Sequence, residues 1–166
     1  MPEIGFNYRL SDVNCALGLS QLRKLDRFIS ARAALVAYYD RRLAELPSAI
    51  MPILRTSGCS PAWHLYPVLI DFAALGATRG ALMRALRAQG IGSQVHYIPV
   101  HRQPYYRRRY GDVRLPGAEY YYSQTLSLPL YVGMTTADVD RVIDALVAFI
   151  GHSGARSPRR LQHSAP

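Results

Sequence analysis

Cysteine is scarce in this sequence of 166 residues, which contains only Cys15 and Cys59. The two are not spaced like zinc ligands, so we expect reduced thiols and no metal site. No apolar run approaches the roughly 20 residues that cross a membrane. The N-terminal segment MPEIGFNYRL also lacks the basic start and the apolar stretch of a secretory signal. These absences predict a cytoplasmic protein that does not enter a membrane.

Lysine is nearly absent as well, because Lys24 is the only lysine and the other 19 of the 20 basic residues are arginines. The formal net charge is +9, a value compatible with binding to nucleic acid or to anionic ligands. However, the arginines are spread along the chain, and the longest run is 107–109, with pairs such as 159–160 in the tail. A bias of arginine over lysine often reflects genomic base composition, so the charge alone does not favour a nucleic-acid function.

The first 46 residues contain a strong helical pattern. Ser11 followed by Asp12 is typical of a helix start, because the hydroxyl caps free N–H groups and the carboxylate suits the first turn. Apolar residues then recur at steps of three and four up to Leu46, which predicts one helix of about 34 residues that ends before Pro47. Such a helix is about 50 Å long, whereas a domain of this size is about 30 to 35 Å across. We therefore expect the helix to overhang the domain, to kink, or to contact a partner.

The remaining chain alternates strand-like and helix-like segments, with 49% hydrophobic residues overall, which is typical of a globular domain with its own core. The expected elements are a strand over 63–72, a helix from the cap Thr78 to Gly90, a strand over 92–98, short helices over 103–110 and 117–124, an extended piece over 126–131, and a last helix capped by Thr136. This order predicts a small α+β sandwich. Residues from His152 onward lack periodicity and predict a disordered tail.

Two segments contain groups suited to ligand binding. The run 93–106, SQVHYIPVHRQPYY, combines histidines, tyrosines and glutamines on a loop stiffened by proline, as sites for polar ligands often do. Before the long helix, Asn7 and Arg9 place an amide and a guanidinium near a helix N-terminus, where they suit an anionic group such as phosphate. The alternatives are an ordinary surface loop for the first segment and an ordinary capping segment for the second.

Together, four segments resemble the DegT/StrS family of pyridoxal-phosphate-dependent sugar aminotransferases. They are GFNYRLSDVNCALGLSQLRKLD, WHLYPVLID, QVHYIPVHRQPYY and AEYYYSQTLSLPLY, and they occur in the order and spacing of that family over residues 4–150. Within the family, QVHYIPVHRQPYY is most similar to the transaminases of pseudaminic acid biosynthesis, whose product is UDP-4-amino-4,6-dideoxy-N-acetyl-β-L-altrosamine.

The resemblance implies the fold and the domain organisation. The chain would be the small C-terminal α+β domain of an aspartate-aminotransferase-type enzyme (PLP fold type I), with a long N-terminal helix and a small sheet packed with helices. Residues 1–46 would form an interface motif and connecting helix, 47–151 the domain, and 152–166 a disordered tail. In full-length relatives the long helix begins against a large cofactor domain. We therefore expect its first half to expose apolar surface here, and the chain to aggregate or dimerise through it.

The resemblance also implies a homodimer whose active site is shared between subunits. The cofactor phosphate of the neighbouring subunit would be bound by Asn7, with Arg9 beside it. The nucleotide-sugar pocket would be lined by Gln94, His96 and Tyr97. Further candidates for contacts to the sugar or diphosphate are His101, Tyr105 and Tyr110.

This chain departs from the family in lacking the catalytic lysine, which forms a Schiff base with pyridoxal phosphate and lies upstream of the Asn7 motif. Lys24 lies inside the expected long helix as a polar surface residue, and arginine cannot form that imine. We therefore expect no catalytic residue here. The chain would be the C-terminal portion of a transaminase that converts a UDP-4-keto-6-deoxy-N-acetylhexosamine to its 4-amino sugar, with glutamate as donor, and it would be inactive alone.

Two alternatives remain. The chain is a non-catalytic remnant that binds a sugar nucleotide or a partner, or, less favoured, a basic nucleic-acid-binding protein. The second alternative would use 107–109 and the tail, and bases would stack on Tyr105, Tyr106 and Tyr110. No recognised nucleic-acid motif accompanies these residues.

Overall fold

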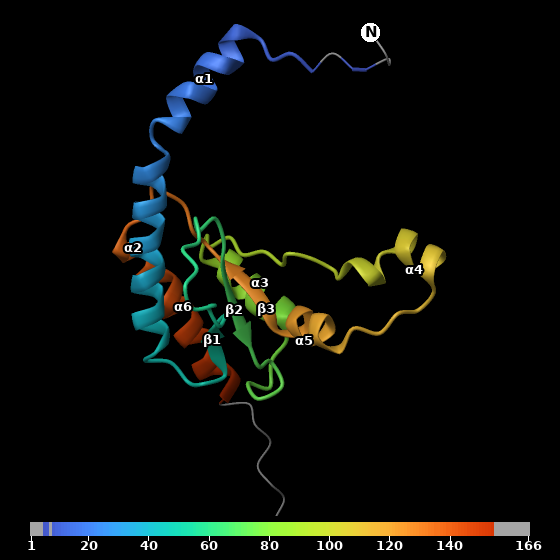
Figure 1. The fold of residues 1–166 in the computed structure, drawn as a ribbon. Coiled ribbons are helices and arrows are strands. Elements are labelled where there is room, and N and C mark those ends of the chain that lie inside the picture. Colours follow the sequence, from blue (N-terminus) through green and yellow to red (C-terminus); the bar gives the residue numbers. More distant parts are fainter. Residues whose placement is uncertain (1–4, 7, 155–166) are drawn as a thin grey trace, which may run out of the picture.

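The computed structural model describes residues 5–6 and 8–154 of the chain (Figure 1). As the sequence predicts, helical segments precede a small sheet with helices packed around it. The elements are α1 (Asp12–Leu22), α2 (Leu25–Leu43), β1 (Ile50–Pro52), β2 (Tyr66–Ile70), α3 (Arg79–Ala88), the 3-10 turn η1 (Val100–Arg102), α4 (Pro104–Tyr110), α5 (Pro116–Gln124), β3 (Thr125–Leu128) and α6 (Thr136–Gly154).

The predicted long helix is divided into α1 and α2. Ser11 caps α1 as expected, since its hydroxyl accepts a hydrogen bond from the N–H of Asn14 at 3.4 Å. The prediction of one continuous helix is wrong at Lys24, whose N–H bonds the carbonyl of Gln21 at 3.0 Å in a tighter turn. No residue of α1 is buried, so no packing against the domain holds α1 in line with α2. The chain therefore kinks, and α1 also extends beyond the domain (Figure 1).

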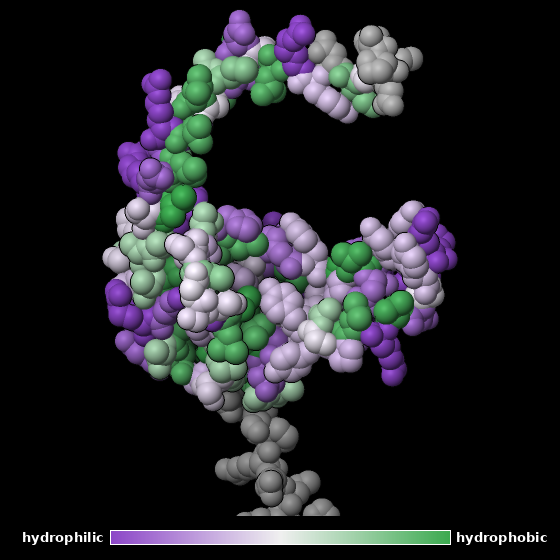
Figure 2. Space-filling model, viewed as in Figure 1, coloured by the Kyte–Doolittle hydropathy of each residue, from purple (hydrophilic) through white to green (hydrophobic). Residues whose placement is uncertain are grey.

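The segment from Phe6 to Leu22 exposes apolar side chains, which confirms the expectation for the first half of the helix. Phe6 is 84% and Val13 78% exposed. The other exposed large apolar side chains in this part are Tyr8, Leu10, Leu17, Leu19 and Leu22. Figure 2 shows hydrophobic residues along the concave side of α1 and hydrophilic ones on the opposite side. In the part of the chain that the structure describes, no helix has both the length and the apolar character needed to cross a membrane.

The sheet consists of three antiparallel strands in the order β1-β2-β3. β2 lies where a strand is predicted, and its residues alternate between buried and half-buried. Sequence reasoning misses β1, because its three residues lie in a loop rich in turn-forming residues. The strand predicted over 92–98 is wrong, because Gln94 alone pairs with β3, through an isolated bridge to Ser127. The chain beyond this bridge continues as a loop, which carries the predicted site residues.

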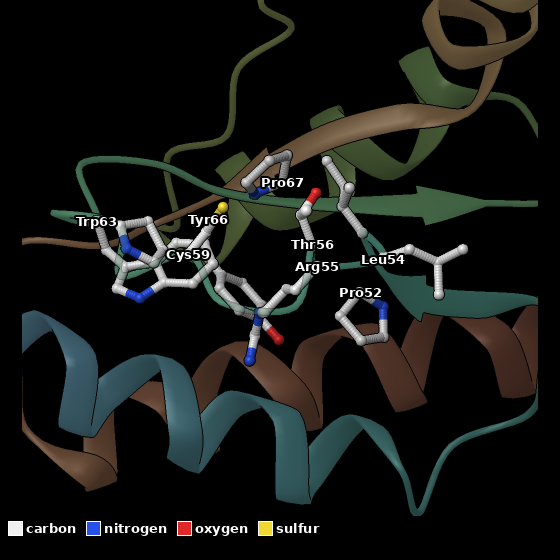
Figure 3. A pocket seen from close by; sticks show the side chains of 10 residues that line it. Pro52, Leu54, Arg55, Thr56, Cys59, Trp63, Tyr66 and Pro67 are labelled. Atoms are coloured by element: carbon white, nitrogen blue, oxygen red, sulfur yellow. The ribbon is translucent and has the colours of Figure 1, made fainter.

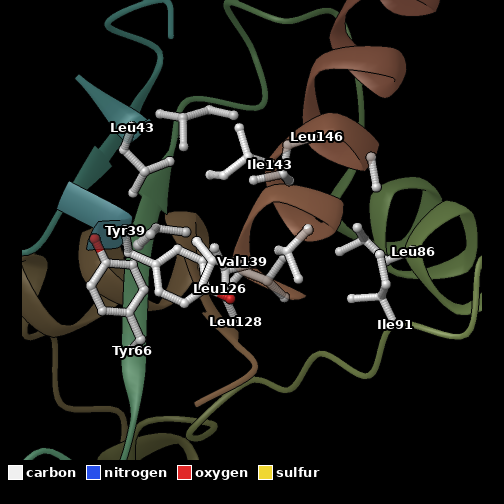
Figure 4. Packing of buried hydrophobic residues seen from close by; sticks show 14 of the residues in the cluster. Tyr39, Leu43, Tyr66, Leu86, Ile91, Leu126, Leu128, Val139, Ile143 and Leu146 are labelled. Atoms are coloured by element: carbon white, nitrogen blue, oxygen red, sulfur yellow. The ribbon is translucent and has the colours of Figure 1, made fainter. Parts of the chain in front are cut away.

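The core lies between the sheet and helices α2, α3 and α6 (Figure 4). Tyr39 of α2 stacks on Tyr66 of β2 with ring centroids 4.5 Å apart. Leu86 of α3 and Leu146 of α6 are almost fully buried in the same core. All four residues of β3 are buried and α5 contacts β2, so side chains cover both faces of β3. Ile91 belongs to this core, so the packed core fixes the start of the loop that follows Ile91.

The last helix begins with a reciprocal cap. The N–H of Thr135 donates to Asp138 Oδ2 at 2.8 Å, and the N–H of Asp138 donates to Thr135 Oγ1 at 3.3 Å, as in a capping box. The cap is therefore Thr135 and not Thr136 as predicted. The helix α6 continues to Gly154, three residues into the predicted tail, and residues 155–166 lie outside the described part of the chain.

Candidate functional site

The structure divides the predicted site segment into two parts (Figure 1). Gln94, His96 and Tyr97 lie next to β3 at the edge of the sheet, where Gln94 is held by its bridge to Ser127. Tyr105 and Tyr110 belong to α4, at the far end of a loop that projects from the domain. The predicted residues therefore do not form one continuous wall.

The part at the sheet edge borders a hollow of about 330 Å³ with a mixed polar and apolar lining, called here the sheet-edge hollow. Its lining includes His64, Gln94, His96 and Ser127, with Leu128 to Leu130 and Gly92-Ser93 completing the wall. The Nδ1 atom of His96 lies 2.9 Å from Ser127 Oγ in a hydrogen bond. Imidazole, amide and hydroxyl groups on one concave surface suit a ligand rich in hydroxyl groups.

Tyr97 contributes a neighbouring ring and does not line this hollow. Its ring meets that of His96 edge-on, with centroids 4.8 Å apart, and it is 70% exposed. The peptide bond between the two residues is cis. The Tyr97 hydroxyl is thus presented to solvent beside the hollow.

Sequence reasoning misses two residues of this hollow, Ser127 and His64. Ser127 is only 5% exposed and stands between two buried leucines of β3. A hydroxyl between two leucines of a strand is the signal that could have identified it, because buried polar groups need partners. His64 lies just before β2, and nothing in its sequence context distinguishes it from a surface residue.

His101 lies between the two parts, in η1. Its Nε2 atom is 3.2 Å from Glu119 Oε1 of α5, and its side chain is only 9% exposed. The imidazole is therefore engaged with the domain, and it fixes the start of the projecting loop.

The tyrosines of α4 form an exposed aromatic row. Tyr105 meets Tyr106 edge-on at 5.2 Å, and Tyr106 stacks on Tyr110 at 6.3 Å between centroids. Tyr105 and Tyr110 are more than half exposed. The Nε atom of Arg109 donates to the Tyr110 hydroxyl at 3.1 Å. These rings offer flat surfaces on which a planar group can stack.

The predicted phosphate-binding residues lie elsewhere. Asn7 lies outside the described residues. Arg9 is exposed in the segment before α1, which Figure 1 places well away from the sheet edge. One chain alone therefore does not bring Arg9 together with Gln94 or His96.

A second hollow, of about 260 Å³, lies under the loop between β1 and β2 (Figure 3). Trp63, Tyr66 and three prolines give it a mainly apolar lining. Its only charged side chain, Arg55, donates to Asp40 at 2.6 Å, and Tyr66 donates to the same carboxylate at 2.8 Å. The bond to Asp40 raises the pKa of Arg55, and burial followed by the bond to Asp40 raises the pKa of Tyr66 above its usual value. The charged and phenolic groups of this second hollow are therefore bonded to each other within the domain.

Among residues 5–6 and 8–154, no group of three or more His, Cys, Asp or Glu residues could hold a metal ion.

Known proteins match this chain over most of its length. The sequence profile of the DegT/DnrJ/EryC1/StrS aminotransferase family matches residues 1–147. Among solved structures, Helicobacter pylori PseC, an aminotransferase involved in the biosynthesis of pseudoaminic acid, superposes with a TM-score of 0.82 at 27% identity. The match covers 90% of this chain and 40% of that one.

Two further structures show the same partial overlap. S. venezuelae DesV, solved in complex with a ketimine intermediate, has 32% identity and a TM-score of 0.75 over 90% of this chain and 39% of its own. The PLP form of Spr1654 from Streptococcus pneumoniae has 26% identity and a TM-score of 0.76, over 87% of this chain and 37% of its own. The chain thus spans about two-fifths of the length of the structures it matches.

Proposed function

The chain belongs to the DegT/DnrJ/EryC1/StrS aminotransferase family, as its motifs led us to expect, and on that premise we propose that it is the C-terminal portion of a nucleotide-sugar aminotransferase. The complete enzyme would convert a UDP-4-keto-6-deoxy-N-acetylhexosamine to the 4-amino sugar of the pseudaminic acid pathway, with glutamate as donor. The observation that carries this proposal is the similarity to PseC over 90% of the chain. We place the enzyme in the cytoplasm, as a homodimer.

The sheet-edge hollow supplies one wall of the sugar site in this proposal. His96 Nδ1 is paired with Ser127, so Nε2 is the ring nitrogen left for a sugar oxygen. The side chain of Gln94 and the exposed Tyr97 hydroxyl add hydrogen-bonding groups next to it. Because neutral hydroxyl groups need donors and acceptors rather than charge, these residue types fit a sugar.

Covalent attachment of the cofactor does not fit the residues present. The only lysine, Lys24, lies at the junction of α1 and α2, away from the sheet edge (Figure 1). When bound, pyridoxal phosphate supplies an electron sink at the carbon that exchanges its amino group. We propose that this chain contributes Asn7 and Arg9 to the cofactor phosphate across the dimer interface, and that it has no transaminase activity alone.

A titration with nucleotide sugars tests the proposed sugar site. We expect UDP-N-acetylglucosamine to shift the amide resonances of Gln94, His96 and Ser127 in a ¹H–¹⁵N spectrum of the full chain, and UDP alone to shift them less. His96→Ala should abolish this difference, whereas His64→Ala, at another residue of the same hollow, should reduce it less. Identical shifts with UDP and with the nucleotide sugar would contradict a sugar site in the sheet-edge hollow.

A non-catalytic relative that retains only sugar-nucleotide or partner binding is the second candidate, since the hydrogen-bonding groups of the sheet-edge hollow would serve binding without catalysis. It would give the same titration but would not restore activity when it is mixed with a separately expressed cofactor domain. Restored activity in the mixture would therefore distinguish the two candidates, whereas the binding titration would not.

A further inference from the structure

A hollow beside helix α3 has a basic lining without any acidic residue. It has a volume of about 440 Å³ and is called here the α3 hollow. Its lining consists of Met83, Arg84, Arg87 and the run from Gly90 to Ser93. The sequence between Asp71 and Asp112 contains no aspartate or glutamate, so no carboxylate on this stretch of chain balances the two guanidinium groups.

The two arginines of the α3 hollow are both exposed and uncommitted. Neither guanidinium has a hydrogen bond or an ion pair with any residue of the chain that the structure describes. Arg55, in contrast, is paired with Asp40. Arg84 and Arg87 are three residues apart on one helix, so their side chains are neighbours and can meet the same ligand.

Closure of the helix end does not require these two arginines. Cations near a helix C-terminus complement its dipole, which is the alternative explanation for their position. However, the N–H groups of Gly90 and Ile91 already bond carbonyls of the last turn at 2.9 and 3.0 Å. Arg141 of α6 donates to the carbonyl of Gln89. The end of α3 is therefore capped by other groups.

Gly92 and Ser93 add neutral donors to the same hollow. Among the described residues, their N–H groups and the Ser93 hydroxyl have no hydrogen-bond partner. No atom lies within 4 Å of the place where a Cβ of Gly92 would stand, so a ligand can approach this backbone closely. Each guanidinium offers up to about five N–H donors. So many donors suit the several oxygens of phosphate better than the two oxygens of a carboxylate.

We propose that the α3 hollow binds a phosphate group, with Arg84 and Arg87 as its charged donors and Gly92 and Ser93 as its neutral donors. The ligand is inorganic phosphate or the phosphate of a small metabolite. No aromatic side chain lines the hollow, so it offers no surface on which a nucleotide base can stack.

The α3 hollow adjoins the proposed sugar site without belonging to it. Gly92 and Ser93 also line the sheet-edge hollow, whereas Arg84 and Arg87 line only the α3 hollow of these two. A bound phosphate thus lies next to the sugar site, and its charge is neutralised by residues outside that site. The proposal goes beyond the proposed function, because phosphate binding requires neither sugar, cofactor nor lysine.

Arginines elsewhere on the chain offer a matched control. Arg23 and Arg27 are exposed near the junction of α1 and α2, and they line none of the hollows described above. The pair Arg23→Ala/Arg27→Ala removes the same charge as Arg84→Ala/Arg87→Ala. The pair Arg84→Lys/Arg87→Lys keeps the charge but loses the planar fork that binds two oxygens at once.

The test is titration of the full chain with sodium phosphate, followed in a ¹H–¹⁵N spectrum at an ionic strength held constant with sodium chloride. We expect saturable shifts of the Gly92 and Ser93 amide resonances, and smaller shifts with acetate. Arg84→Ala/Arg87→Ala should weaken phosphate binding by about tenfold or more, because hydrogen bonds from charged groups contribute on that scale. The control pair should change it by less than about twofold, and the lysine pair should give an intermediate loss.

Glycerol 3-phosphate distinguishes the two sources of the phosphate group. Tighter binding of glycerol 3-phosphate than of inorganic phosphate would assign the hollow to a phosphorylated metabolite, and equal or weaker binding would assign it to free phosphate. Acetate that shifts Gly92 and Ser93 as much as phosphate does would contradict the proposal. So would an equal loss of phosphate affinity in the two alanine pairs, which would make the effect one of net charge.

A single-stranded oligonucleotide is the remaining probe. If it binds more tightly than phosphate and loses binding only in Arg84→Ala/Arg87→Ala, the α3 hollow is part of a nucleic-acid surface and the proposal is wrong. Circular dichroism of each variant should show an unchanged melting curve, because all four substituted arginines are exposed.

The sugar titration separates failure of this proposal from failure of the proposed function. Phosphate binding at Gly92 and Ser93 without sugar-specific shifts at His96 would support the α3 hollow and refute the sugar site. Sugar-specific shifts at His96 in a chain that does not bind phosphate would support the sugar site and refute the α3 hollow.

Discussion

The imidazole of His96 and the hydroxyl of Ser127 lie 2.9 Å apart, and they join a loop residue to a buried strand of the sheet. Ser127 also exchanges both backbone hydrogen bonds with Gln94, at 3.2 and 2.8 Å. The strand thereby fixes the backbone of the loop and the orientation of one of its side chains. Positioning of this kind is what a site on a loop requires to bind a ligand specifically.

Ser127→Ala should therefore weaken sugar binding while the fold persists. The variant removes the hydrogen-bond partner of His96 Nδ1. One such hydrogen bond contributes about 0.5–1.5 kcal/mol of net free energy. We expect UDP-N-acetylglucosamine affinity to fall by about threefold to tenfold in calorimetry. Ser123→Ala is the control, since Ser123 donates to the carbonyl of Tyr120 on α5 and does not line the sheet-edge hollow. Equal losses in the two variants would contradict the role of Ser127.

The stability of the domain should fall at high pH because of two buried tyrosines. Burial, as the largest cause, raises the pKa of Tyr39 and of Tyr66 above the usual 10.0. A group with a raised pKa in the folded state contributes stability that is complete below its unfolded pKa and declines as pH rises above it. The free energy of unfolding in urea should thus be constant from pH 8 to about 9.5 and decrease beyond pH 10.

Phenylalanine variants identify the source of this loss. Tyr39→Phe should make the decrease above pH 10 shallower, because the ring stays buried and no longer titrates. Tyr120→Phe, at an exposed position, should leave the decrease unchanged. A pH dependence that is the same in all three proteins would show that the buried tyrosines do not cause it.

Alanine substitutions at two neighbouring residues of α6 should destabilise the domain by very different amounts, because one side chain is buried and the other is exposed. Leu146 is fully buried among the side chains of Figure 4, so Leu146→Ala should lower the free energy of unfolding by about 2–5 kcal/mol. Val147 is 47% exposed, and Val147→Ala should lower it by less than about 1 kcal/mol. Chemical denaturation of both variants measures the contrast, and similar losses would contradict the packing of α6.

The apolar side chains of α1 predict self-association. Leu17 is 59% exposed, and a helix with such a face gains stability by covering it. Leu17→Asp should shift sedimentation profiles at high protein concentration toward the monomer. Ser20→Asp adds the same charge to α1 and should have a smaller effect. A wild-type chain that stays monomeric at high concentration, with slow hydrogen exchange in α1, would contradict this prediction. It would show that the apolar side chains of α1 are already covered within one chain.

Much of the fold could be predicted because local patterns and tertiary packing agree. The alternation in β2 and the Thr78 cap of α3 are both observed, since the residues that form each element also face the core. The length of the predicted helix led us to expect a kink as one outcome, but its position at Lys24 could not be predicted, because the apolar repeat continues across it from Leu22 to Leu25. The apolar repeat marks the side of the helix that packs against other elements. In the first half of the repeat, which forms α1, no residue is buried in this structure.

The candidate site was predicted only in part. The residue types from Gln94 to Tyr110 indicated a polar ligand, but not that Gln94 and Tyr110 would lie in separate parts of the structure. The alternation over 92–98 resembles a strand, whereas only Gln94 finds a partner on β3. Ser127 was missed because its role depends on the residue opposite it in space, which the local sequence does not reveal.

Reconstitution with a cofactor domain tests the central claim most directly. The chain would be mixed with pyridoxal phosphate and a separately expressed N-terminal domain of a family member, and borohydride-reducible absorbance of a lysine-bound cofactor would be recorded, followed by amination of the 4-keto sugar. We predict no specific signal from the chain alone, recovery of absorbance and amination in the mixture, and loss of both with Asn7→Ala. Stable cofactor linkage and amination by the chain alone would contradict the claim, as would a mixture that gains no activity.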